Sequence, residues 1–177
     1  SRPLNVPGEV EFKNRGLTYC ATCDGPLFGD KTVAVVGGGN SALDAALQLV
    51  NIATKVYIIN NTPNLGGDAV MREKAENSRK ITVINNAKVT AVLGDKMVKR
   101  ININKEGLEE SLDVQGVFVE IGLLPNSDFS GQTDKNQHGE IIVDCYNQTN
   151  IPGIFAAGDV TNVPEKQIII AAGEGAK

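Results

Sequence analysis

Apolar residues in the first third of the chain gather in short runs that are typical of buried parallel strands. Residues 31–36 are continuous in valine and alanine and lead directly into a glycine-rich turn. Residues 41–50 place apolar side chains at three- and four-residue spacing, which predicts a helix with one buried face. A second β-branched run at 55–59 completes a strand–helix–strand unit of about 30 residues. The pattern predicts an α/β fold with a parallel sheet.

The middle of the chain changes from continuous apolar runs to alternation. A polar helix is expected after the glycines at 66–67, followed by a strand at 81–84. Residues 87–114 consist of short alternating segments separated by turn residues, and they predict an antiparallel β-meander. A buried strand is expected again at 117–121. The predicted fold class is therefore a Rossmann-like domain with a parallel sheet and an antiparallel meander.

The last third begins with a loop-rich stretch at 126–139, which we interpret as a domain boundary. Beyond it, strands are expected at 141–143 and 154–156, and a helix from about Gln167. The pattern therefore predicts that the chain divides into two parts at this loop.

Charge and composition exclude two classes of function. The net charge is −4 and the Lys and Arg residues form no basic run, so nucleic-acid binding is not expected. No apolar stretch reaches the length of a membrane span. The chain has three cysteines, two of them in a Cys-x-x-Cys pair. This usage favours a catalytic pair in the cytoplasm over the disulfide framework of a secreted protein.

The glycine turn carries the first chemical signal. Gly37 permits a tight turn out of the strand, and Gly39 allows the backbone to approach a pyrophosphate. Ala42 is small enough for the helix to pack close to the strand, so that phosphates lie at the helix N-terminus. Because the motif follows a strand and opens a helix, it predicts a dinucleotide site. The alternative is a glycine-rich turn that binds nothing.

The residues after the second strand should contact the adenine ribose. An acidic residue there favours NADH, whereas arginine favours NADPH. The chain has Asn60-Asn61-Thr62, which carries neither charge. Asn60 can hydrogen-bond ribose hydroxyls, and amides suit a 2′-phosphate poorly. NADH is therefore mildly favoured, with NADPH left open.

The second chemical signal is the thiol pair. In a Cys-x-x-Cys pair one thiol has a lowered pKa and the other resolves a mixed disulfide, so Cys20 and Cys23 are the predicted redox centre. Asp24, next to the second thiol, is placed to move the proton that each thiolate gains or loses. The alternative is half of a zinc site, for which only Cys145 and His138 remain as distant ligands.

These motifs resemble the low-molecular-weight thioredoxin reductase family and its close relative, the flavoprotein subunit of alkyl hydroperoxide reductase. The resemblance covers essentially the whole chain. It rests on residues 4–9, 19–28, 37–42, 121–126, 154–160 and 166–170. It implies an FAD domain interrupted by a nicotinamide-binding domain that carries the redox disulfide. Residues 1–125 would be the nicotinamide domain, and 126–177 the C-terminal segment of the FAD domain.

The resemblance also implies roles for individual residues. Cys23 would face the flavin, and Cys20 would attack the disulfide of the acceptor protein. Asp159 would contact the FAD ribityl chain, with Gln167 and Ile168 at the helix end that faces the flavin. The implied nicotinamide-nucleotide site consists of Gly37, Gly39, Asn40, Ser41, Asn60 and Gly122.

The predicted function is that of a flavin-dependent disulfide reductase, with a thioredoxin-like or glutaredoxin-like protein or a peroxiredoxin as partner, a homodimer at full length, and no metal. The N-terminal half of the family's FAD domain has no counterpart here, so the chain resembles an internal fragment that alone would bind no FAD. Two alternatives are a nucleotide-binding module without turnover and a reductase of the ferredoxin–NADP type. The second is disfavoured because those relatives lack the Cys-x-x-Cys.

Overall fold

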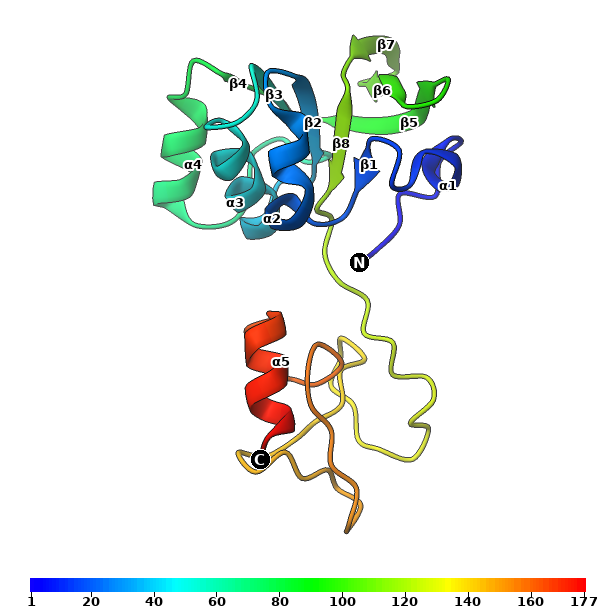
Figure 1. Cartoon of the computed structure of the whole chain (residues 1–177), viewed down its shortest axis with the longest axis vertical. Helices are drawn as coiled ribbons and strands as arrows, with labels where there is room; N and C mark the ends of the chain where they lie inside the picture. The colour runs from blue at the N-terminus through cyan, green and yellow to red at the C-terminus, as the bar shows by residue number, and fades with distance from the viewer. The chain divides into compact units, whose positions relative to one another are not determined.

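The computed structural model covers residues 1–177 and divides into two compact units, Ser1–Gly122 and Leu123–Lys177 (Figure 1). The division falls after Gly122, close to the expected boundary after residue 125. Each unit is described by itself.

The first unit is built on a parallel sheet, as the apolar runs predicted. The strand order is β1-β8-β2-β3-β4, and every neighbouring pair is parallel. The strands are β1 (Leu17–Thr18), β2 (Thr32–Val36), β3 (Lys55–Ile59), β4 (Ile81–Ile84) and β8 (Gly116–Val119). Because β8 lies between β1 and β2, the carboxyl ends of these three strands meet at one edge of the sheet.

Helices cover one face of this sheet. They are α3 (Asn40–Leu49), α4 (Ala69–Glu76) and the short α2 (Ala21–Asp24), which continues into the 3-10 helix η1 (Gly25–Phe28). Val33 and Val35 of β2 point to this face and pack with Leu43 and Leu49 of α3 in one buried cluster. The expected helices at 41–50 and after residue 67 are confirmed within two residues at each start. The sequence analysis did not predict α2 or β1.

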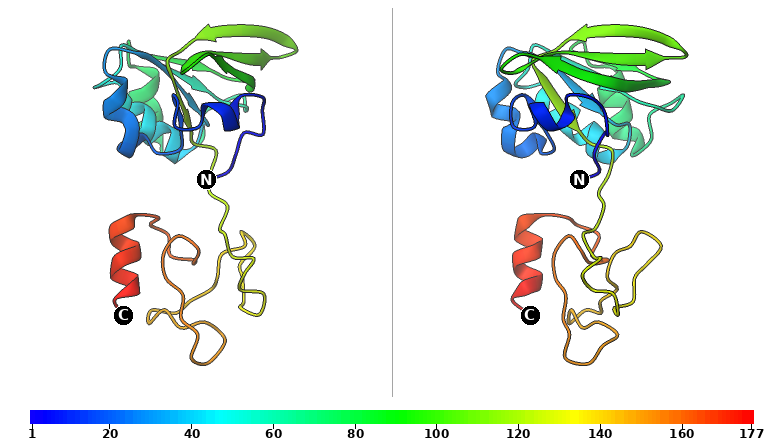
Figure 2. Two further views of the ribbon diagram at one scale, coloured as in Figure 1. Left: turned by 45° about the vertical axis from the view of Figure 1, so that its right-hand side comes forward. Right: turned by 90° about the vertical axis from the view of Figure 1, so that its right-hand side faces the viewer.

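The antiparallel meander covers the other face and forms a layer of its own (Figure 2). It consists of β5 (Ala87–Gly94), β6 (Val98–Lys105) and β7 (Leu108–Asp113), paired in that order. Ala34 and Val36, the alternate residues of β2, pack against Ile101 and Ile103 of β6. The sheet is therefore buried on both sides, which explains why its strands read as continuous apolar runs.

The N-terminal segment is fixed by a buried carboxylate. Glu9 opens the short helix α1 (Glu9–Phe12) and is only 5% exposed. It accepts hydrogen bonds from the backbone N–H groups of Leu4 and Asn5, both at 2.7 Å, and from the Tyr19 hydroxyl at 2.6 Å. Burial raises the pKa of Glu9, but these three donors outweigh it, so the pKa lies below its ordinary value.

Glu9→Gln is therefore expected to destabilise the first unit by about 2–3 kcal/mol. The substitution replaces one accepting carboxylate oxygen by an NH₂ group, which would then face a hydrogen-bond donor of the protein. The pKa of Glu9 is lowered by folding, so its contribution is present above the unfolded pKa and is lost as the pH falls through the folded pKa. Urea unfolding at neutral and acidic pH measures both effects. Glu11→Gln, at an exposed position of the same helix, is the control. Equal stability of the two variants would contradict the assignment.

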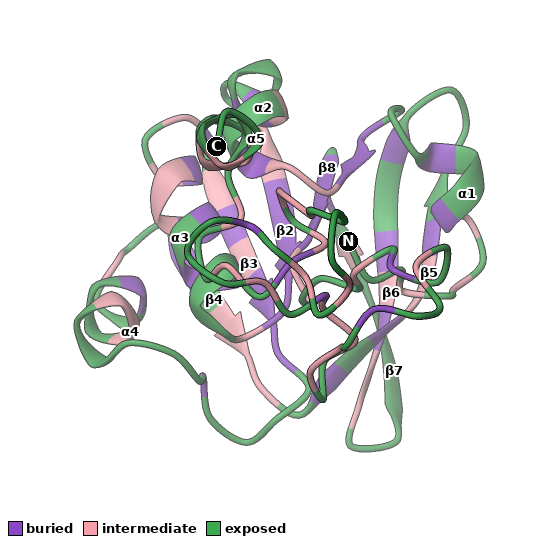
Figure 3. Ribbon diagram, turned by 90° about the horizontal axis from the view of Figure 1, so that it is seen from below, coloured by how far each residue is buried: buried purple, intermediate pink, exposed green.

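The second unit contains one helix, α5 (Ile168–Gly175), which has no buried residue (Figure 3). The ion pair between Lys166 and Glu140 measures 2.9 Å and, with a further bond from Asn136, holds the pKa of the Glu140 carboxyl below its usual range.

The strands expected at 141–143 and 154–156 are wrong. Ile141 and Phe155 form only isolated bridges, to Lys135 and Thr161 and to Gln148 respectively. A strand requires a hydrogen-bonding neighbour along its length, and an apolar run by itself does not supply one. No helix of either unit combines the length and apolar character needed to cross a membrane.

Candidate functional site

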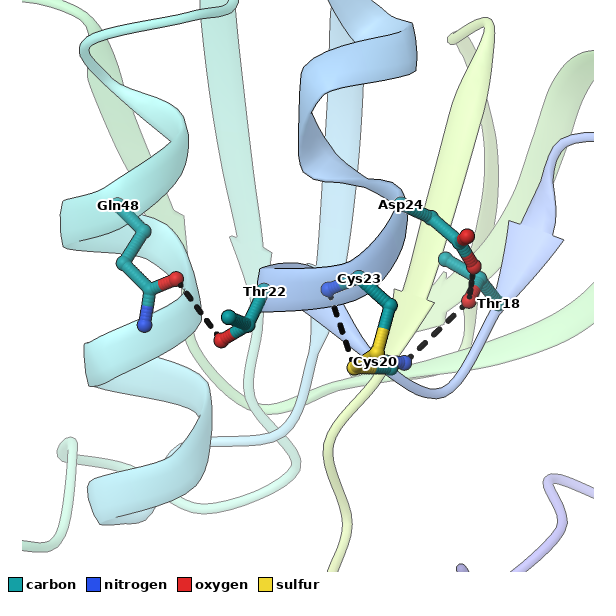
Figure 4. Close-up of a disulfide and its surroundings, with 6 residues drawn as sticks. All are labelled: Thr18, Cys20, Thr22, Cys23, Asp24 and Gln48. Carbon is teal, nitrogen blue, oxygen red and sulfur yellow. Dashed lines mark hydrogen bonds between the residues drawn. A yellow bond between two sulfur atoms is a disulfide. The ribbon is translucent and has the colours of Figure 1, made fainter. Parts of the chain in front are cut away.

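The thiol pair lies at the start of α2, which begins two residues beyond the end of β1. Cys20 is the extended residue that precedes the helix, and its sulfur accepts a hydrogen bond from the Cys23 backbone N–H at 3.1 Å (Figure 4). The two cysteines form a disulfide with their Cα atoms 5.3 Å apart. Cys23 is exposed and Cys20 is partly exposed, so a partner can reach the bond from solvent. Cys145, in the second unit, is a free exposed thiol.

Asp24 closes the same helical turn and is held by a residue that the sequence analysis missed. The hydroxyl of buried Thr18 donates to the Asp24 carboxylate, and the Thr18 oxygen accepts from the Cys20 backbone N–H at 3.3 Å (Figure 4). The hydroxyl therefore links the carboxylate to the backbone of the first cysteine. Thr22 donates to Gln48 at 3.1 Å and ties α2 to α3. The structure thus brings Cys20, Cys23 and Asp24 into a single turn.

The glycine turn joins β2 to α3. Gly37 has φ +137°, and a Cβ at this position would lie 2.2 Å from the Glu120 carbonyl oxygen, so only glycine fits. Gly39 precedes α3 with no side-chain cap, and a Cβ there would meet nothing within 4 Å. The first amides of α3 therefore face open space, which is the arrangement that a pyrophosphate requires.

The residues that open α3 differ in their roles. The Asn40 side-chain oxygen accepts from the Asp68 backbone N–H at 2.7 Å, which ties the start of α3 to the start of α4. The nearby backbone bond from Gly66 N–H to the Gly38 carbonyl, at 2.7 Å, fixes the same loop. Ser41 is exposed beside the turn. The contacts of Asn40 and Ser41 with a nucleotide stay predictions.

Asn60, the expected ribose ligand, is 2% exposed and already hydrogen-bonded within the protein. Its amide nitrogen donates to the Thr62 carbonyl at 3.0 Å and to the Asn85 side chain at 2.8 Å. Its oxygen accepts from the Thr62 hydroxyl at 2.9 Å. In this structure Asn60 therefore shapes the loop after β3, and the ribose contact stays a prediction.

Glu120 is the ionisable group that links the two motifs, and the sequence analysis gave it no role. Its backbone N–H donates to the Val36 carbonyl at 2.8 Å, which extends the pairing of β8 and β2 by one residue. The pKa of Glu120 is raised to about 7, mainly by burial and also by the charge of Asp44, and the opposing effects of the Ala21 backbone N–H and the N-terminal amino group are smaller. The sequence feature that could have identified Glu120 as a site residue is its position as a charged residue at the carboxyl end of an apolar parallel strand.

The remaining predicted residues fall in different places. Gly122, with φ +100°, ends the first unit just beyond β8. Asp159, Gln167 and Ile168 belong to the second unit. Asp159 is exposed after a turn in which Gly158 has φ +84°. Gln167 precedes α5 without a side-chain cap, and Ile168 is 88% exposed, so the first amides of α5 are free.

The chain is similar to known proteins in sequence and in structure. The F subunit of the alkyl hydroperoxide reductase of Pseudomonas putida is 49% identical over 180 residues, and NADH dehydrogenase of Bacillus subtilis is 46% identical over 178 residues. Each alignment covers 99% of this chain and 35% of the relative. Thioredoxin reductase of Lactococcus lactis is similar in structure, with a TM-score of 0.83 and 36% identity over 99% of this chain and 59% of that one.

The chain thus spans about a third of these curated relatives and about three-fifths of the solved reductase. The family described as pyridine nucleotide-disulphide oxidoreductase matches residues 1–175, which is nearly the whole sequence. Together with the disulfide on α2 and the glycine turn after β2, this match shows that the chain belongs to the pyridine nucleotide-disulphide oxidoreductase family.

Proposed function

We propose that this protein is a flavin-dependent disulfide reductase, which passes electrons from a nicotinamide nucleotide through FAD to the Cys20–Cys23 pair and on to an acceptor protein. The observation that carries the proposal is the position of the disulfide. It follows β1, and the glycine turn follows β2, at the same edge of one parallel sheet. Ligands of open parallel sheets bind at this edge.

The residues present fit both cofactors. The open space beside Gly39 and the uncapped start of α3 suit a pyrophosphate. The uncapped start of α5 suits the electron-rich edge of a flavin, and exposed Asp159 offers a carboxylate to ribityl hydroxyls. When bound, the two cofactors supply hydride and electron-pair transfer.

The protein's own residues would manage the sulfur and proton chemistry. Reduction breaks the Cys20–Cys23 bond, with two electrons and two protons converting the disulfide into two thiols. Asp24, held by Thr18, would exchange a proton with the thiolate beside it. A Cys20 thiolate would then attack the acceptor disulfide, and Cys23 would resolve the mixed disulfide within the same chain.

The acceptor that we propose is a thioredoxin-like or glutaredoxin-like protein or domain, or a peroxiredoxin system. The names of two relatives, an alkyl hydroperoxide reductase and a thioredoxin reductase, support this class. A cytoplasmic location and a full-length homodimer belong to the same proposal.

Anaerobic titration of the full-length protein tests the function. Stoichiometric nicotinamide nucleotide should bleach the flavin absorbance, and thiol counting should then show a new pair at Cys20 and Cys23. A colourless full-length protein that binds nucleotide without forming thiols would instead support a nucleotide-binding module without turnover.

The full-length enzyme is expected to prefer NADH over NADPH by about tenfold or more in kcat/KM, because no positive side chain in 60–62 can meet a 2′-phosphate. The name of the Bacillus subtilis relative, NADH dehydrogenase, supports this preference. Steady-state kinetics with both nucleotides provide the measurement. Asn61→Arg, at an exposed position, should lower the ratio of kcat/KM for NADH to that for NADPH, because it adds a positive charge that can pair with the 2′-phosphate. A tenfold preference for NADPH in the unmodified enzyme would refute the prediction.

A further inference from the structure

Glu120 lies where the disulfide and the glycine turn approach each other. Its side chain follows that of Phe118 by two residues, so both point to the same face of the sheet. Phe118 packs in the buried cluster that contains Ala21 of α2. The Ala21 backbone N–H lies close enough to stabilise the ionised Glu120 carboxylate. Thr18 of β1 pairs with Phe118 of β8, and Cys20 and Glu120 each follow that parallel pair by two residues, so the two residues lie at the same level beyond the ends of neighbouring strands.

The other side of Glu120 contacts the nucleotide turn. A Cβ on Gly37 would lie 2.2 Å from the Glu120 carbonyl oxygen, so the backbone of Glu120 forms one wall of the turn. The charged groups that face the carboxylate are Asp44 of α3 and the Ser1 amino group. On α2 the ionisable side chains are the two thiols and Asp24, and Asp24 is already held by Thr18. The proposed mechanism leaves Glu120 unused.

We propose that Glu120 is a positioning residue for the dithiol, whose carboxylate sets the pH at which the reduced Cys20–Cys23 pair forms its reactive thiolate. An ionised carboxylate disfavours a second negative charge beside it and therefore raises the pKa of the neighbouring thiol. Only the thiolate is nucleophilic, so this charge limits attack on an acceptor disulfide. The inference rests on the proposed function, because it assigns a regulator to the same redox pair.

The pH dependence of thiol reactivity follows from the ionisation of the Glu120 carboxylate. Burial raises the pKa of Glu120 to about 7, so the group is mainly neutral at about pH 5.5 and mainly ionised at about pH 8. Removing the charge should change thiol reactivity at the higher pH and leave it unchanged at the lower pH. A merely structural effect of the substitution would alter reactivity at every pH.

Alkylation of the reduced 177-residue chain tests the proposal without flavin or nicotinamide. Both proteins carry Cys145→Ser, so that the free exposed thiol does not react. Dithiothreitol reduces the disulfide and is itself oxidised to its cyclic disulfide. After its removal, the cysteine thiolate displaces iodide from iodoacetamide, forming an S–C bond, and mass spectrometry follows the rate from about pH 5.5 to about pH 8.5.

Glu120→Gln should increase the alkylation rate about threefold between about pH 7 and pH 8, with no change near pH 5.5, because loss of the carboxylate charge lowers the pKa of the neighbouring thiol. Glu76→Gln, at an exposed site on α4, should leave the profile unchanged. If Glu120→Gln does not fold, Glu120→Asp replaces it, because its shorter side chain withdraws the charge and should give a smaller shift in the same direction.

Superimposed profiles for the folded Glu120 variant and the unsubstituted chain would overturn the role of Glu120. That outcome would leave the reductase function standing, since the assay contains no cofactor or acceptor. Conversely, a full-length protein that forms no thiols on titration with nicotinamide nucleotide would refute the reductase function, and the alkylation profile would still measure the effect of Glu120 on the thiols.

Discussion

Replacing either Cys20 or Cys23 by serine in the full-length protein is expected to lower disulfide reductase activity by about a thousandfold or more. The two sulfurs form one bond, and neither cysteine has another thiol within the same turn. A single thiol can form a mixed disulfide with the acceptor but cannot resolve it. Reduction of the flavin by the nicotinamide nucleotide should survive, because the serine hydroxyl leaves α2 and the glycine turn in place.

Two measurements separate these steps. Stopped-flow absorbance follows flavin reduction, and a coupled assay with a thioredoxin-like acceptor follows disulfide turnover. Cys145→Ser is the matched control, since it removes the third thiol of the chain from an exposed position in the second unit. It should leave both rates unchanged. Reductase activity retained in the Cys20 or Cys23 variant and lost in the Cys145 variant would transfer the redox role to Cys145.

The features that were predictable from the sequence are those set by local pattern. Valine and alanine in β2 are buried on both faces, and this produces the continuous apolar run that predicted a parallel strand. Gly37 marks the turn because its φ of +137° and the nearby Glu120 carbonyl admit only glycine, whereas Gly39 leaves open space before the first amides of α3. The Cys20–Cys23 pair was evident because its spacing alone brings two thiols within bonding distance on one helical turn.

The features that were missed depend on residues far apart in sequence. β1 is only Leu17–Thr18, and it becomes a strand because β8, from the end of the unit, pairs with it. Glu120 gained its surroundings in the same way, since β8 places it beside α2 and α3. Residues 141–143 failed as a strand for the opposite reason, because nothing within the second unit pairs along their length. Strand partners are tertiary information, which apolar periodicity does not contain.

The two glycines of the nucleotide turn should respond to alanine in opposite ways. Gly37→Ala forces a Cβ to 2.2 Å from the Glu120 carbonyl oxygen, in a residue with φ +137°. Moving β8 away from β2 would relieve the clash with the Glu120 carbonyl, and the disfavoured φ would require the turn itself to change conformation. We expect a loss of about 3 kcal/mol or more, a large part of the stability of a domain of this size. Urea unfolding followed by circular dichroism measures it.

Gly39→Ala is the matched substitution, since it adds the same methyl group two residues later, where nothing lies within 4 Å. Its φ of −93° suits any residue, so stability should change by less than about 1 kcal/mol. The methyl group would nevertheless occupy the space through which a pyrophosphate reaches the first amides of α3. NADH affinity, measured by calorimetry, should therefore fall about tenfold or more while the variant stays folded. If folded Gly39→Ala binds NADH with wild-type affinity, the pyrophosphate binds elsewhere. If Gly37→Ala has wild-type stability, the turn does not approach β8 as closely as the structure shows.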